Sequence, residues 1–108
     1  MTSRTRPNGT MPMESLIHDV AHHRFAIALG AENSAFISYY EKDHHLVLDH
    51  TEVPVAFGGR GIGARLAQAV FDHLRTTGQR VELECSFLKR FVTLHPEYAA
   101  IVVPAPGS

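Results

Sequence analysis

The chain has 108 residues, of which 44% are hydrophobic and 19% charged, and its formal net charge is −1 at pH 7. A chain of this size and balance is expected to form one soluble domain with a modest core. The near-neutral charge argues against nucleic-acid partners, which need a concentrated basic surface. No apolar run approaches the roughly 20 residues that span a membrane, so we expect a cytoplasmic protein without a membrane partner.

Both ends of the chain lack apolar periodicity. Residues 1–13 are predicted to be a disordered leader and residues 104–108 a disordered tail, which leaves one domain at residues 14–103. The single cysteine, Cys85, cannot form an internal disulfide. The eight histidines include adjacent pairs but no spacing typical of zinc ligands, so no metal site is expected.

Three antiparallel strands are predicted before the first helix. In residues 24–29 the apolar side chains of Phe25, Ile27 and Leu29 alternate with other residues, as in a half-buried strand. A turn then leads into a second strand at residues 34–41, and another turn leads into a third at residues 46–53.

The third strand runs into a glycine-rich segment with the sequence VPVAFGGRGIGARL at residues 53–66. Closely spaced glycines allow tight turns and close approach of a ligand, and the unpaired N–H groups of a following helix favour an anion. The Gly-Lys-Ser/Thr ending of a P-loop is absent, and so is the alternating strand and helix pattern of a dinucleotide-binding domain. The segment therefore predicts a phosphate-binding loop of another kind.

A helix follows at residues 61–77, because Ile62, Leu66, Val70 and Leu74 recur every fourth residue. Gly78 is expected to end it. A fifth predicted element is a strand at residues 80–85, after which Ser86 is expected to cap a second helix that ends before residue 96. A short last strand is predicted at residues 100–103.

The spacing Val-Pro-x-x-x-x-Gly-x-Gly-x-Gly in residues 53–63 resembles the pyrophosphate loop of GNAT-type N-acetyltransferases. Four landmarks occur in the same order as in the small, truncated GNAT branch called YjdJ-type or N-acetyltransferase domain-containing. They are Arg24-Phe25 at the start of the first predicted strand, residues 49–54 leading into the glycines, Cys85-Ser86-Phe87 after the next strand, and His-Pro-Glu-Tyr at residues 95–98. The resemblance covers roughly residues 16–100.

The resemblance implies a mixed α/β (α+β) fold with a mainly antiparallel sheet and the order βββ-α-β-α. It implies that strands 46–53 and 80–84 splay apart to hold the pantetheine arm of acetyl-CoA or coenzyme A. The pyrophosphate would lie on a set of residues around the glycines: Val53, Val55, Gly58, Gly59, Arg60, Gly61, Ile62 and Gly63. The acceptor would be an amine on a small molecule or a protein, and the chain would act as a monomer or homodimer.

Three side chains are candidates for catalysis. Cys85 precedes a predicted helix whose N-terminus would stabilise a thiolate nucleophile, although a cysteine at this position is also compatible with a buried apolar role. His50 and Glu52 share a strand face and could act as a base, or could simply face solvent.

Two departures from the family pattern are visible. Gly58 stands where an arginine or glutamine is usual, and Phe91 stands near the place of a tyrosine that protonates the leaving thiolate. Two functions therefore stay open, an N-acetyltransferase and a coenzyme A or acyl-CoA binding module with little transfer activity. A protein-interaction role that retains only the fold is a third alternative.

Overall fold

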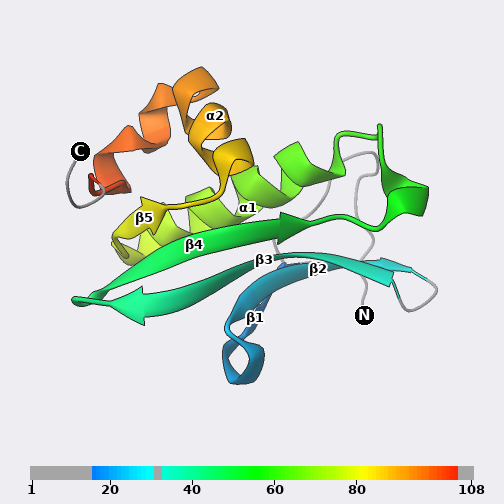
Figure 1. The fold of residues 1–108 in the computed structure, drawn as a ribbon, viewed down its shortest axis with the longest axis horizontal. Coiled ribbons are helices and arrows are strands. Elements are labelled where there is room, and N and C mark those ends of the chain that lie inside the picture. The colour runs from blue at the N-terminus through cyan, green and yellow to red at the C-terminus, as the bar shows by residue number, and fades with distance from the viewer. Residues whose placement is uncertain (1–15, 31–32, 105–108) are drawn as a thin grey trace, which may run out of the picture.

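The structure is a computed structural model that describes residues 16–30 and 33–104. The predicted leader lies outside the described residues, and so does the predicted tail apart from Pro104. The strands are β1 Leu16–Asp19, β2 Arg24–Gly30, β3 Asn33–Lys42, β4 His45–Glu52 and β5 Val81–Leu83, and the α-helices are α1 Ile62–Thr77 and α2 Ser86–Leu94 (Figure 1).

The predicted fold class is confirmed. The five strands form one sheet in the order β1-β2-β3-β4-β5, with antiparallel pairing up to β4 and parallel pairing between β4 and β5. Four strands precede α1, whereas the sequence predicted three. β1 was missed because it is only four residues long and lies at the sheet edge, where Ile17 and His18 are exposed and leave no alternation to detect.

The hairpin between β3 and β4 has a two-residue turn at Asp43 and His44. Both residues have positive φ, 50° and 69°, as a type I′ turn requires. Lys42 and His45 pair across the turn. This turn therefore fixes the register in which β4 runs along β3.

α1 lies along one face of the sheet (Figure 1). The predicted stripe is buried, including Leu66, Val70 and Leu74. Gly78 ends the helix as predicted, with φ 76° and its N–H bonded to the carbonyls of Leu74 and Arg75. None of the helices in the described part of the chain is long and apolar enough to cross a membrane.

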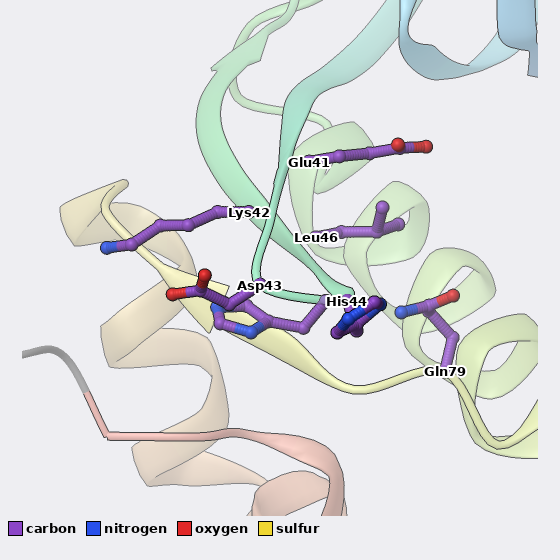
Figure 2. A pocket seen from close by; sticks show the side chains of 7 residues that line it. Glu41, Lys42, Asp43, His44, Leu46 and Gln79 are labelled. Atoms are coloured by element: carbon purple, nitrogen blue, oxygen red, sulfur yellow. The ribbon is translucent and has the colours of Figure 1, made fainter.

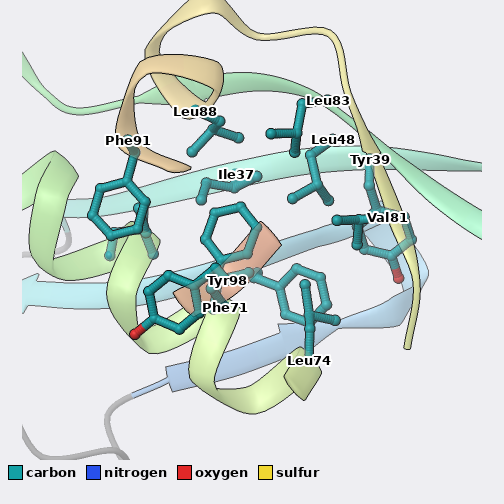
Figure 3. Packing of buried hydrophobic residues seen from close by; sticks show 14 of the residues in the cluster. Ile37, Tyr39, Leu48, Phe71, Leu74, Val81, Leu83, Leu88, Phe91 and Tyr98 are labelled. Carbon is teal, nitrogen blue, oxygen red and sulfur yellow. The ribbon is translucent and has the colours of Figure 1, made fainter. Parts of the chain in front are cut away.

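The core lies between α1, α2 and the helix-facing side of β2 to β5 (Figure 3). Phe71 of α1 stacks on Phe91 of α2 and on Tyr98, with ring centroids 5.7 and 5.4 Å away. Tyr98 belongs to a 3₁₀ segment, Pro96–Ile101, so the predicted strand at residues 100–103 is reduced to a single bridge between Val102 and Val81. Burial of Tyr98 in the aromatic stack explains why this segment coils onto α1 instead of extending along β5.

Candidate functional site

β4 and β5 pair over three residues and then separate. Leu48 and Leu83 form the last pair, and the Leu48 carbonyl then accepts hydrogen bonds from the N–H groups of Glu84 at 2.9 Å and Cys85 at 3.4 Å. β4 continues to Glu52, and no strand among the described residues pairs with its edge beyond Leu48. Such an edge presents N–H and C=O groups with which an extended ligand can pair.

A β-bulge in β4 coincides with this separation. Tyr39 pairs with Leu48 while Ser38 pairs with His50, so Asp49 is an extra residue on β4. The Asp49 carboxylate accepts a hydrogen bond of 2.7 Å from the Ser38 hydroxyl. Because a bulge bends its strand and increases the local twist, it directs β4 away from β5. We call the place where the two strands no longer pair, bordered by residues 49–52 and 84–87, the opening.

The glycine loop connects β4 to the first turn of α1. It passes through a 3₁₀ turn, Val55–Phe57, and reaches Gly61, the N-cap of α1. Gly59 and Gly61 have φ of 78° and 71°, a conformation that L side chains adopt only with strain. The glycines are therefore required by the path of the backbone.

The N-terminus of α1 is open. Gly61 gives no side-chain cap, no acidic residue lies in the first turn, and the Arg65 N–H bonds to the Gly61 carbonyl at 3.1 Å. The N–H groups of Ile62, Gly63 and Ala64 precede this bond, so they have no acceptor within the helix. Three such donors at the positive end of a helix dipole fit a diphosphate.

The side chains of the loop residues differ in their surroundings. Val55 is 97% exposed, whereas Ile62 is buried and Val53 packs against the core. The Arg60 guanidinium lies over the ring of Phe57, 5.3 Å from its centroid. The loop thus carries one cation and is anchored to the core at both ends.

Cys85 lies on the side of the opening that faces the helices. It is half-buried against the core, and its Sγ is 3.5 Å from Oγ1 of Thr51. Cys85 occupies the N-cap position of α2, and no side-chain capping hydrogen bond is made there. The predicted cap at Ser86 is therefore wrong, because the helix begins one residue earlier than that prediction requires and Ser86 is its first residue.

His50 and Glu52 lie on the opposite face of the sheet, which we call the outer face. On β3 they pair with Ser38 and Phe36. The β3 side chains that alternate with these two point to the other face of the sheet and are buried in the core. His50 Nε2 is 2.8 Å from Glu52 Oε1, and both side chains are more than half exposed. The structure thus joins these two residues to each other and separates them from Cys85, with the opening between.

α2 has no tyrosine at the place where the resemblance implies an acid for the leaving thiolate. Phe91 is buried and stacks on His95 at 4.3 Å. The Tyr98 hydroxyl donates a 2.6 Å hydrogen bond to the carboxylate of Asp72. Burial, followed by this hydrogen bond, raises the pKa of Tyr98 to about 12. Tyr98 is therefore a packing residue.

Sequence reasoning missed two residues beside the opening. The position of Thr51 on the helix side could have been inferred from strand alternation, because His50 and Glu52 on either side of it face outward. Phe87 was noted only within the landmark that begins with Cys85, and its contact with α1 links two helices distant in sequence, so no local pattern indicates it.

A separate pocket lies at the β3–β4 turn, at the other end of β4 (Figure 2). It has a volume of about 390 Å³ and contains none of the predicted site residues; its lining is Glu41, Lys42, Asp43, His44, His45, Leu46 and Gln79. Within residues 16–30 and 33–104, no group of three or more potential metal-ligating side chains comes together.

Comparison with known proteins gives a consistent result. Residues 24–101 match the family described as GCN5-related N-acetyl-transferase. Protein NATD1 of Danio rerio is 35% identical over 85 residues, 75% of this chain and 77% of that protein. Protein NATD1 of Homo sapiens is 33% identical over 81 residues, 73% of this chain and 72% of that protein.

A solution structure of a Staphylococcus aureus protein described as GCN5-like is similar in fold. Its TM-score is 0.59 and its sequence identity 28%, and the match covers 79% of this chain and 85% of that one. The similarity thus includes both the sequence and the arrangement of sheet and helices.

Proposed function

This chain belongs to the GCN5-related N-acetyltransferase family, and on that basis we propose that it binds acetyl-CoA and transfers the acetyl group to an amine. One observation carries the proposal: the unpaired edge of β4 leads directly through the glycine loop to the open N-terminus of α1. A diphosphate at the helix and an extended arm along the strand edge would use both features at once.

The pyrophosphate would bind at the residues predicted from the sequence. The backbone N–H groups from Gly59 to Gly63 would donate to it, and Arg60 and Arg65 would add positive charge. The loss of an arginine or glutamine at Gly58 removes one side-chain contact but no backbone donor. The pantetheine arm would then pair with the β4 edge beyond Leu48 and bring the thioester into the opening.

The catalytic residues would act from the two faces. The thioester supplies an activated acetyl group. The Cys85 sulfur, at the positive end of α2, would attack its carbonyl; the new S–C bond forms as the bond to the coenzyme A sulfur breaks, and that thiolate takes a proton from water. An amine arriving from the outer face would then attack the acetyl-Cys85 carbonyl, give a proton to the His50–Glu52 pair, and release the Cys85 thiolate.

The outer face suits an amine acceptor. Carboxylates of Asp49, Glu52 and Glu84 border the opening on β4 and after β5. A protonated amine would be attracted to this border before it loses its proton.

A coenzyme A binding module is the second candidate, and the buried Phe91 favours it, because no hydroxyl is available there to protonate a leaving thiolate. The test is to incubate the protein with acetyl-CoA and a panel of mono-, di- and polyamines and lysine peptides, and to measure release of free coenzyme A thiol. Amine-dependent release supports the transferase. Binding of coenzyme A without release for any amine supports the module.

A further inference from the structure

The ring of Phe87 lies against the backbone of the first turn of α1. Phe87 is the second residue of α2, and a Cβ built on Gly63 would lie 3.1 Å from its Cζ, closer than side chains normally approach. A residue larger than glycine at position 63 would therefore require this ring to shift by a few tenths of an ångström. The contact holds the N-terminal turns of α1 and α2 next to each other.

Phe87 also exposes part of its apolar surface. It is 40% exposed, while Leu88 and Phe91 of the same helix are buried. Phe87 approaches Gly63, in the loop proposed to hold the pyrophosphate, and follows Cys85 by two residues in the chain. An arm that joins a diphosphate at Gly63 to a thioester near Cys85 would pass near this ring.

We propose that Phe87 is the apolar contact for the pantetheine arm and that it determines the preference for coenzyme A over the nucleotide half of the same molecule. The proposal rests on the proposed function, since it assigns a residue to the same site. Gly63 acts as a positioning residue for Phe87, because the absence of a side chain at Gly63 allows the Phe87 ring to pack against α1. Neither role requires Phe87 to take part in the chemistry.

The experiment is a calorimetric titration with two ligands. One is coenzyme A, and the other is its nucleotide half, which keeps the adenine nucleotide and the diphosphate but lacks the pantetheine arm. For Phe87→Ala, the Kd of coenzyme A is expected to rise about tenfold, as loss of contact with a partly buried aromatic ring implies, while the Kd of the nucleotide stays unchanged. Phe87→Leu should recover most of the affinity. Leu94→Ala, a control on the same helix at a residue 65% exposed, should change neither Kd.

A second variant tests the contact itself. Gly63→Ala should weaken coenzyme A binding by displacing the ring, and in the Phe87→Ala background it should add nothing, which is a non-additive double-mutant cycle. Equal losses for both ligands in Phe87→Ala would overturn the proposal, because the ring would then act only by shaping the loop. An unchanged Kd for coenzyme A would also overturn it while leaving the proposed function intact. Failure of the unaltered protein to bind coenzyme A would overturn both.

Discussion

Oγ1 of Thr51 and Sγ of Cys85 lie 3.5 Å apart, just beyond the last residues that β4 and β5 share. The contact places the one thiol of the chain at the opening and on the helix side, while the side chains next to Thr51 in sequence point to the outer face. The two faces therefore present different groups, a thiol on one and a histidine–carboxylate pair on the other.

The first prediction concerns Cys85. Incubation with acetyl-CoA should add one acetyl group to the intact protein, as seen by mass spectrometry, and Cys85→Ala should abolish the addition. Loss of a nucleophile should lower kcat by at least about a thousandfold with little change in the Kd of coenzyme A. A Cys85→Ala protein that transfers acetyl at the normal rate would show instead that the amine attacks the thioester directly.

His50 is expected to act in the second half-reaction. His50→Gln should lower the rate of transfer to an amine by about a hundredfold or more, the usual range for general base catalysis, yet leave the acetylation of Cys85 unchanged. His44→Gln, in the β3–β4 turn, is the matched control and should leave both steps unaltered. If His50→Gln slowed acetylation of Cys85 instead, the assignment of His50 to the amine would be wrong.

Tyr98 should make stability depend on pH in the alkaline range. Its pKa is raised to about 12 by burial and by the hydrogen bond to Asp72, so the folded state holds the phenol proton more tightly than the unfolded state. The stabilisation that the Tyr98 phenol provides is fully present below about pH 10, the pKa of tyrosine in the unfolded chain. It is lost as the pH rises through about 12, the pKa of Tyr98 in the folded protein. Urea unfolding should show this loss in the unaltered protein and a smaller one in Tyr98→Phe.

At pH 7, Tyr98→Phe should lower the free energy of unfolding by about 1 kcal/mol, the usual net value of a hydrogen bond. Tyr40→Phe is the control. Its hydroxyl also donates to a carboxylate, that of Glu84 at 2.7 Å, but on the surface. A larger effect for Tyr40→Phe than for Tyr98→Phe would contradict the structural role given to Tyr98.

The effect of the buried Glu82 carboxylate on stability should depend on its two partners, the Lys42 ammonium and the His45 imidazole. Glu82 is 4% exposed and lies 3.6 Å from Lys42 Nζ and 3.1 Å from His45 Nε2. Lys42→Met should cost about 1–3 kcal/mol, because it leaves a buried charge with one partner fewer. Adding Glu82→Gln should recover part of that loss in urea unfolding. If the double variant were less stable than Lys42→Met, the Glu82 carboxylate would be stabilising without Lys42, through His45, and this account would be contradicted.

The sequence predicts those parts of the molecule that depend on local patterns. The stripe on α1 and its end at Gly78 follow from helical periodicity and from glycine's tolerance of positive φ. The open first turn of α1 follows from the glycine spacing. β1 could not be predicted, because a four-residue edge strand with exposed side chains carries too little pattern.

Long-range features are also beyond a local pattern. The bulge at Asp49 depends on how β3 pairs with β4, and the Gly63–Phe87 approach depends on how α2 packs on α1. The separation of His50 from Cys85 follows from which face of the sheet the helices cover. These relationships are set by tertiary packing, so they required the structure.

The central claim is that the glycine loop binds coenzyme A, and calorimetric titration of Gly61→Val tests it most directly. Gly78→Val is the matched control, because both glycines have φ above 70° at the two ends of α1 and valine is strained at either by roughly 1–2 kcal/mol. The account predicts that both variants lose stability, that Gly78→Val binds coenzyme A normally while folded, and that Gly61→Val does not bind. Normal binding by a folded Gly61→Val protein, or equal loss in both variants, would contradict it.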